Sequence, residues 1–399
     1  MKLQIIALKI SILVSHVLAA APAQLFSPLV AQKVHNTFKL LPNPLQFPHT
    51  TDSTKGAWGL VDPNWWTSGF FPGTGYLMNT RKALCGDPTN ELGTTDWLAL
   101  SRSASNALLS LTDKNGIGHD VGFISFPFIE ELTINPNNQT AINAVNRFAG
   151  LLAARFNSVV GCTRSWDTSD PTDFQVIIDN MMNLEVLFVS AALTRNKTLE
   201  NIAIRHADTT QANHIRSDGS SWHVVEYNST TGVAFKKRTA QGYSDSSTWT
   251  RGQAWGVYGF ANMYRHTQKA SYLDTARKMA TYFINNTPSD GVIPWDFNAP
   301  LTPTPRPADT SAAMLAVNAF LMLAQYDPAA GAKDKWTNAA LQLLGNNVPF
   351  AWKTSWQSLL SNGTSNKPSN NFNTGLVYGD YYFVLAGNEL LKRNLTTCS

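Results

Sequence analysis

The stretch AINAVNRFAGLLAARF, residues 141–156, places an apolar side chain at every third or fourth position. Its apolar stripe consists of Ile142, Val145, Phe148, Ala149, Leu152 and Phe156. This spacing keeps the apolar side chains on one face of an α-helix, because one turn takes about 3.6 residues. The stretch therefore predicts an amphipathic helix that packs its apolar face against a core.

The same period recurs on both sides of this stretch. An upstream stripe consists of Trp97, Leu98, Leu100, Ala104, Ala107, Leu108 and Leu111. A downstream stripe consists of Ile177, Ile178, Met181, Met182, Leu184, Leu187 and Phe188. Further helices are expected around residues 198–214, 252–267, 271–286, 311–326, 335–347 and 380–393. Long alternating patterns typical of strands are scarce, although residues 222–236 could form a short hairpin.

Loops rich in Gly, Asp and aromatic residues separate these helices. They cover residues 116–123, 164–167, 218–223 and 290–296, and they recur at about the length of a helical hairpin. Hairpins arranged in a ring would bring every second connection to one face, where the loops would line a common cleft. Functional residues often lie on loops held by a rigid scaffold. We therefore expect an all-α toroid with its site at one end.

The composition indicates one folded domain behind a signal peptide. Hydrophobic residues make up 43% of the 399 residues and charged residues only 15%, which argues against disorder. Residues 1–20 combine Lys2 and Lys9 with an apolar run too short to span a membrane, followed by small residues. An uncleaved anchor is the alternative. No interdomain linker follows, so we expect a single domain over residues 24–399 and secretion to the extracellular space.

Sequons and cysteines support the secretory route. Asn-x-Ser/Thr sequons, candidate glycosylation sites, occur at Asn138, Asn196, Asn228, Asn285, Asn362 and Asn394. Six sequons behind a signal peptide indicate a eukaryotic glycoprotein, and a fungal source is favoured. The three cysteines leave one unpaired, and we expect Cys85 to bond Cys398, because chain ends often meet in closed helical folds.

Charge and motif content exclude several classes of function. The formal net charge is only +4, and Lys2 and Lys9 belong to the expected signal peptide, so neither nucleic acid nor a membrane is expected as a partner. Metal-binding His/Cys patterns, nucleotide loops and dinucleotide fingerprints are missing from the sequence. We expect no metal, no cofactor and a monomer. Carboxylates, aromatics and an arginine remain, as is typical of a carbohydrate site.

Two aspartates stand out by their surroundings. Asp120 lies between Gly118 and Gly122, where a ligand can approach the backbone closely, or it is a turn residue bonded to local N–H groups. Asp179 lies within the apolar run VIIDNMMNL, residues 176–184. A buried aspartate is rare unless it is partnered or functional. The alternatives are an N-cap of the following helix or a solvent-facing residue.

Aromatic segments supply candidate sugar-binding residues. Trp249 and Arg251 lie in QGYSDSSTWTRGQAW, residues 241–255, just before an expected helix. A tryptophan face stacks on a sugar ring, and a guanidinium can hold a carboxylate through two hydrogen bonds. Trp255 is either a further ligand contact or part of the helix core. Trp65 and Trp66 cannot both face one core from a helix, so one of them should face a ligand or another segment.

Several of these segments, in this order, resemble the unsaturated glucuronyl hydrolases, glycoside hydrolase family 88. They are Trp66 with Gly69–Gly73, His119–Phe123, Ile178–Leu184, Tyr243–Gly256, Pro294–Asp296 and Asp309–Ala313. The resemblance spans roughly residues 55–390 and implies an (α/α)6 barrel with a cleft at one end. The sequons and terminal cysteines are unlike the bacterial members and indicate a secreted fungal one.

The resemblance also implies a reaction. The family acts on a 4,5-unsaturated uronic acid at the non-reducing end of a lyase-generated oligosaccharide. An acid protonates C4 of the enol ether, water adds at C5, and the resulting hemiketal opens to release the linkage. Asp179 matches the general acid, and Asp120 matches the second essential carboxylate. The positions that match substrate-binding residues are Trp66, His119, Trp166, His223, Gln241, Trp249, Arg251 and Trp255.

Three other functions compete with this hypothesis. Unsaturated rhamnogalacturonyl hydrolases share the fold and reaction, although His119–Phe123 favours the glucuronyl group. Some ordinary inverting glycosidases on the same toroid use adjacent aspartates, and this sequence has no Asp-Asp pair. A non-catalytic sugar-binding protein would need the aromatics but not both Asp120 and Asp179.

Overall fold

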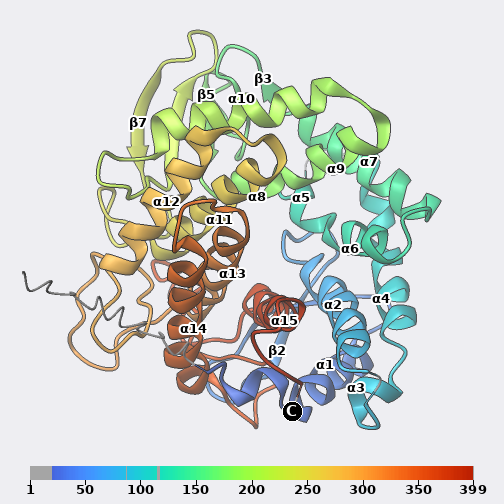
Figure 1. Ribbon diagram of the computed structural model, residues 1–399. Coiled ribbons are helices and arrows are strands. Elements are labelled where there is room, and N and C mark those ends of the chain that lie inside the picture. The colour runs from blue at the N-terminus through green and yellow to red at the C-terminus, as the bar shows by residue number, and fades with distance from the viewer. Residues whose placement is uncertain (1–19, 87, 115–116, 399) are drawn as a thin grey trace, which may run out of the picture.

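The computed structural model describes residues 20–86, 88–114 and 117–398 and is dominated by helices (Figure 1). The expected signal peptide therefore lies almost entirely outside the described residues. The main helices are α1 (Pro28–Leu40), α2 (Phe70–Leu84), α3 (Glu91–Thr94), α4 (Trp97–Ser105), α5 (Val121–Ile124), α6 (Phe126–Ile134), α7 (Gln139–Ala153), α8 (Asn180–Asn183), α9 (Glu185–Thr194), α10 (Lys197–His214), α11 (Thr250–Thr267), α12 (Ala270–Asn285), α13 (Thr310–Tyr326), α14 (Ala332–Ala351) and α15 (Val377–Lys392).

The helices form two concentric rings, the (α/α)6 barrel expected from the sequence (Figure 1). The inner ring runs from α2 through α5/α6, α8/α9, α11 and α13 to α15, which packs back against α2. The outer ring consists of α4, α7, α10, α12, α14 and α1. Inner helices such as α13 are buried on nearly every face, whereas outer α7 and α12 are amphipathic.

Short strands lie between the helices. Strands β1 (Phe47–Thr51) and β2 (Trp58–Val61) form a hairpin, as do β3 (Phe156–Asn157) and β4 (Cys162–Thr163). A three-stranded antiparallel sheet has the order β5 (Asp173–Ile177), β6 (Val224–Asn228) and β7 (Ala234–Arg238). The last two strands confirm the hairpin expected around residues 222–236.

Three helix boundaries differ from the expectation. The stripe from Ile177 is not one helix, because Ile177 ends strand β5 and the helical part is divided into α8 and α9. The β-branched residues Val176, Ile177 and Ile178 are buried, and the first two pair with β6. Phe156 belongs to β3 rather than to α7, and the helix from Trp97 becomes a 3-10 helix, η2 (Asn106–Leu111), after Ser105.

Most buried apolar residues form one core cluster that extends from Leu25 to Leu390. Among the described residues, no helix is both long and apolar enough to span a bilayer. The division into residues 1–20 and one domain over 24–399 stays a prediction.

The expected disulfide is present. Cys85, at the end of α2, bonds Cys398, which follows α15, and Cys162 is free and buried. The bond therefore ties the N-terminal inner helix to the C-terminal one.

Replacing both Cys85 and Cys398 with serine is expected to lower the free energy of unfolding by about 2–4 kcal/mol. The bond joins residues 313 positions apart, so it restricts the unfolded chain strongly. Denaturant unfolding with and without dithiothreitol measures the effect. The reductant should destabilise the native protein and leave the double variant unchanged; equal stability of the two proteins would contradict this account.

Candidate active site

The candidate residues meet at the end of the barrel where the inner helices begin. Trp66 precedes α2, Asp120 precedes α5, Asp179 precedes α8, and Trp249 and Asp309 precede α11 and α13. A helix N-terminus carries a partial positive charge and unpaired N–H groups. This end of the barrel is therefore favourable for an anionic ligand.

Asp179 lies between strand β5 and helix α8. It occupies the N-cap position of α8, but its side chain makes no capping hydrogen bond. Its carboxylate is 14% exposed, and Oδ2 has no hydrogen-bond partner. The structure thus excludes the two alternatives left by the sequence, a capping residue and a solvent-facing one, and leaves an unused carboxyl oxygen inside the site.

The surroundings of Asp179 favour its protonated form. The pKa of Asp179 is raised to about 7, mainly by burial and also by the charge of Asp120, although Arg251 and His119 act in the opposite direction. Desolvation is the largest cause, because a charged carboxylate loses its hydration when apolar groups surround it. Asp179 can therefore hold a proton near neutral pH, as a general acid must.

Asp120 pairs with its sequence neighbour rather than with local backbone. Its Oδ1 lies 3.0 Å from Nε2 of His119, and it makes no capping hydrogen bond to α5. The side chain of Asp120 is 24% exposed, whereas His119 is buried. Asp120 lies in a turn, but its carboxylate does not make the local backbone bonds of the turn-residue alternative, and one carboxylate oxygen remains available to a ligand.

Asn183 links the loop that carries Asp120 to the turn that carries Asp179. Its Oδ1 accepts a 2.9 Å hydrogen bond from the backbone N–H of Phe123. Gly122 lies directly against Asn183: a Cβ at Gly122 would lie 2.4 Å from Oδ1 and 2.5 Å from Cα of Asn183. The glycine beside Asp120 therefore serves close packing against the turn that carries Asp179.

Gly122→Ala is expected to reduce kcat by about 10²-fold, because misplacing reacting groups by about 1 Å costs that much. The added Cβ would push the Asp120 loop away from the Asp179 turn. The matched control is Gly150→Ala on α7, where an added Cβ meets nothing within 4 Å. Steady-state kinetics on both variants measure the effect. Unchanged kcat in Gly122→Ala, or an equal loss in Gly150→Ala, would contradict the role of this contact.

His223 directs an N–H group towards Asp179. Its Nδ1 accepts a 3.2 Å hydrogen bond from the backbone N–H of Ala240, so in the neutral ring the proton lies on Nε2. Burial, together with the charges of Arg251 and Arg238, holds the pKa of His223 well below its usual value. Nε2 has no hydrogen-bond partner and lies 3.7 Å from Oδ2 of Asp179. One hydroxyl or water oxygen can bond both groups.

Arg251 is fixed by partners on three sides. Its Nη1 donates to Asp309 Oδ2 at 2.6 Å and to the Thr364 carbonyl, and its Nη2 donates to the Ser365 carbonyl at 2.7 Å. The guanidinium also lies 4.6 Å from the ring centroid of Trp249. Both members of the Arg251–Asp309 pair are buried. Arg251 therefore places a fixed positive charge close to Asp179.

Gln241 and Arg251 donate hydrogen bonds to the same backbone carbonyl oxygen. Its Nε2 donates to the Ser365 carbonyl at 2.9 Å, so one backbone oxygen holds both side chains. Gln241 is partly exposed, and it keeps its amide oxygen and one N–H for a ligand.

The tryptophans differ in position. Trp249 packs against His223 with ring centroids 4.3 Å apart, and the partly exposed Trp166 lies 5.9 Å from the same ring. Trp66 is partly buried against Phe123, while its neighbour Trp65 is 47% exposed. Trp66 thus packs against another segment and stays partly exposed, whereas Trp65 lies largely at the surface.

Trp255 does not belong to this group. Its side chain is fully buried and packs between Phe123 and Tyr382, with ring centroids 5.3 and 5.8 Å away. Because of its position in the second turn of α11, the side chain of Trp255 points into the barrel core. The prediction that Trp255 binds substrate is wrong, and the core alternative is correct.

A protein from Formosa agariphila named unsaturated glucuronyl hydrolase is 37% identical to this chain over 338 residues. The match covers 82% of this chain and 79% of the relative. The chain belongs to the unsaturated glucuronyl hydrolases, glycoside hydrolase family 88. A Bacillus sp. strain GL1 protein of the same name is 30% identical over 74% of this chain and 76% of its own length. An unsaturated chondroitin disaccharide hydrolase from Streptococcus pneumoniae is 30% identical over 82% of each chain.

Solved structures of the family share the fold. The crystal structure of an unsaturated glucuronyl hydrolase specific for heparin superimposes with a TM-score of 0.83 at 28% identity, covering 94% of this chain and 99% of that one. The Bacillus sp. GL1 enzyme gives 0.80 at 25% identity over 94% and 97%. A comparison with protein-family models gave no match. The hydrolase is thus a glycosidase-type enzyme, as the sequence predicted.

Sequence reasoning missed several residues that shape the site of this glucuronyl hydrolase. Asp309 and the 364–365 backbone hold Arg251, and Asn183 joins the loop of Asp120 to the turn of Asp179. Asp309 lies in the segment Asp309–Ala313, which carried part of the resemblance, so its presence there was the available signal. Within the described ranges, no group of three or more His, Cys, Asp or Glu side chains could hold a metal ion.

The activity of the hydrolase is expected to fall about tenfold per pH unit above about pH 7, because only protonated Asp179 can act as the acid. Since the charge of Asp120 raises the pKa of Asp179, Asp120→Asn should move this basic limb to lower pH. A pH profile of kcat/KM for both proteins is the measurement. A wild-type profile that stays flat to pH 9, or a shift to higher pH in the variant, would contradict the assignment.

Proposed function

We propose that this glucuronyl hydrolase removes a 4,5-unsaturated uronic acid from the non-reducing end of disaccharides that lyases release from glycosaminoglycans. The observation that carries the proposal is the Asp179 carboxyl group, raised in pKa to about 7, with a free oxygen beside Nε2–H of His223. Relatives named for chondroitin and heparin substrates support the glycosaminoglycan class.

The anionic sugar binds at the N-terminal ends of the inner helices. Arg251 supplies a fixed positive charge, but most of its N–H groups already donate to protein oxygens. Gln241 is partly exposed and keeps free hydrogen-bonding groups, so it makes the direct contact to the uronate. Trp166 and Trp66 offer ring faces to the sugar.

The reaction begins with proton transfer from Asp179 to C4 of the enol ether. The positive charge that develops at C5 and the ring oxygen is relieved when water adds at C5. The Asp179 carboxylate takes the proton of that water, so the residue returns to its starting state. His223 Nε2–H holds the water or a sugar hydroxyl beside Asp179, and Asp120 binds sugar hydroxyls. The hemiketal then opens, and the glycosidic linkage breaks.

The experiment incubates the folded protein with unsaturated disaccharides from chondroitin, heparin, xanthan and pectin-type chains. Loss of the ultraviolet absorbance of the conjugated double bond reports hydration. Turnover of the chondroitin or heparin products is expected. Turnover of the rhamnogalacturonan product alone would favour the rhamnogalacturonyl alternative. Cleavage of saturated glycosides would favour an ordinary glycosidase. Binding of the sugars without turnover would favour a sugar-binding protein.

We further propose that the hydrolase is secreted as a monomeric glycoprotein. The sequons and the Cys85–Cys398 disulfide support an oxidising secretory route. Asn196, Asn285 and Asn394 are exposed, and they are the strongest glycan acceptors. Asn138 is partly buried, and its amide donates to Glu131, so it is the weakest. The test is to express the protein in a fungal host, compare its mass before and after deglycosylation, and measure its size by size-exclusion chromatography. An intracellular, unmodified or dimeric product would contradict the proposal.

A further inference from the structure

Two loops at the site end of the barrel are joined to each other. The Gln241 loop, residues 239–249, leads from β7 to α11 and ends with Trp249. The other loop connects α12 to α13 and carries Asp296. Trp249 and Asp296 form an isolated antiparallel bridge between the two loops. The position of the Gln241 loop therefore depends on the loop that carries Asp296.

The tip of the Gln241 loop is a turn with little packing of its own. Residues 243–246 are exposed, whereas Gly242 and Ser247, on either side of them, are buried. An exposed segment gains little from apolar contacts, so its conformation depends on the hydrogen bonds that hold its ends.

The carboxylate of Asp296 binds both ends of this turn. Its Oδ2 accepts a 2.9 Å hydrogen bond from the N–H group of Tyr243 and a 2.6 Å hydrogen bond from the hydroxyl group of Ser247. Its Oδ1 accepts from the N–H group of Asn298, in its own loop, at 2.9 Å. Asp296 is fully buried, so it acts on the turn from below and does not contact the solvent.

The end of the turn next to Gln241 is packed tightly against Asp296. A Cβ at Gly242 would lie 2.8 Å from Oδ2 of Asp296 and 2.7 Å from Oγ1 of Thr239. Gly242 directly follows Gln241, so a shift at this contact moves the backbone that carries the Gln241 amide. The other end of the turn has a second support, because Arg216 donates to the carbonyl groups of residues 246 and 247.

The burial of this carboxylate is unfavourable by itself. Burial raises the pKa of Asp296, whereas the hydrogen bonds from Ser247, Tyr243 and Asn298 lower it. A buried aspartate is rare unless it is partnered or functional. The partners of Asp296 are the ends of a loop that carries a substrate-binding candidate, so its role is expected to concern that loop.

We propose that Asp296 is a positioning residue for the uronate subsite, because its bonds to Tyr243 and Ser247 hold Gln241 in place for the uronate carboxylate. The inference rests on the proposed function, in which Gln241 makes the direct contact to the uronate. The Ser365 carbonyl orients the Gln241 amide by accepting from Nε2 at 2.9 Å, and Asp296 fixes the backbone from which that side chain projects.

The first experiment measures steady-state kinetics on a lyase-released unsaturated disaccharide. Asp296→Ala is expected to raise KM at least about tenfold and to keep kcat within about threefold, because a hydrogen bond to a charged group is lost while the general acid stays intact. Asp296→Asn has one acceptor oxygen in place of two, so it should raise KM at least about threefold, and it decides the matter if Asp296→Ala does not fold. An unchanged KM in a folded variant, or a loss confined to kcat, would overturn the proposal.

A double-mutant cycle tests whether Asp296 acts through Gln241. Gln241→Ala should itself raise KM about tenfold, and adding Asp296→Ala should then raise KM by less than about twofold, because both substitutions remove the same contact. Additive losses would overturn the proposal. Absence of hydration by the native protein would refute the proposed function, whereas native hydration with an unchanged KM in the Asp296 variants would overturn this inference alone.

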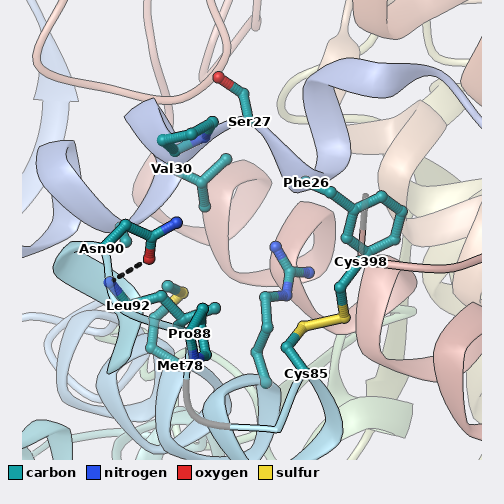
Figure 2. A pocket seen from close by; sticks show the side chains of 12 residues that line it. Phe26, Ser27, Val30, Met78, Cys85, Pro88, Asn90, Leu92 and Cys398 are labelled. Carbon is teal, nitrogen blue, oxygen red and sulfur yellow. Dashed lines mark hydrogen bonds between the residues drawn. A yellow bond between two sulfur atoms is a disulfide. The ribbon is translucent and has the colours of Figure 1, made fainter. Parts of the chain in front are cut away.

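Two variants control for a loss of stability without an effect on the site. Asp327→Ala removes a buried carboxylate that follows α13, at the opposite end of the barrel, and that accepts from Ala329 N–H and Trp336 Nε1–H. The Cys85→Ser/Cys398→Ser variant lacks the disulfide at the end of α2 (Figure 2). Both should be less stable than the native protein and keep its KM. An increase of KM in these controls as large as that in Asp296→Ala would overturn the proposal.

Discussion

Asp179→Asn is expected to reduce kcat by about 10³-fold or more, because the amide has no proton to give to carbon and cannot take one from water. The native side chain combines a pKa of about 7 with an oxygen that has no protein partner. The amide has nearly the same shape, so the fold and the affinity for the disaccharide should be retained. Single-turnover kinetics and equilibrium binding on the folded variant separate the two effects.

Asp380→Asn is the matched control. Burial also raises the pKa of Asp380 to about 7, but its two oxygens accept backbone N–H groups of Leu359 and Leu360. A raised pKa alone therefore does not define an acid catalyst; a free oxygen in the site is also needed. Asp380→Asn should lose stability and keep kcat within about threefold, since it leaves the general acid intact. Near-normal turnover by folded Asp179→Asn would refute the mechanism.

Asp309→Asn is expected to lower the free energy of unfolding by about 3–5 kcal/mol. Asp309 is fully buried and pairs with buried Arg251 at 2.6 Å, so the substitution leaves a charge without a counter-ion. Its Oδ1 caps α13 by accepting from Ser311 N and Ala312 N, and an asparagine oxygen can keep these bonds. The measured loss therefore reports the ion pair rather than the cap.

Asp96→Asn is the control that measures the contribution of a helix cap alone. Asp96 also caps a helix, accepting from Ala99 N at the start of α4, but it is exposed. Its substitution should cost less than about 1 kcal/mol, because asparagine caps helices as well as aspartate. Denaturant unfolding of both variants is the measurement. Asp309→Asn should also raise KM for the anionic disaccharide, since Arg251 loses one of its anchors; a variant as stable as the native protein would contradict the structural role of the pair.

Helix positions and the catalytic candidates were predictable because their signals are local. The stripe of residues 142–152 predicts α7, since the helical period depends only on neighbours along the chain. Asp120 and Asp179 stand out because each lies in an unusual local context, between glycines or within an apolar run. The Cys85–Cys398 bond followed from the expected closure of a ring.

The wrong predictions for Ile177 and Trp255 have the opposite cause. Ile177 has the spacing of a helix residue, but pairing with Val224 places it in a strand. Trp255 has the composition of a sugar-binding segment, but the second turn of α11 points it into the core. In both places tertiary contacts override a local pattern.

The sequence by itself determined the helical class, the family resemblance and the two carboxylates, because each is encoded in residues close together. Only the tertiary structure decided which groups surround these carboxylates. Asp179 meets Nε2 of His223, Arg251 meets Asp309 and Ser365, and Asn183 meets Phe123 across long stretches of chain. Burial, and with it the raised pKa of Asp179, arises only when helices distant in sequence close around the same point and remove its water.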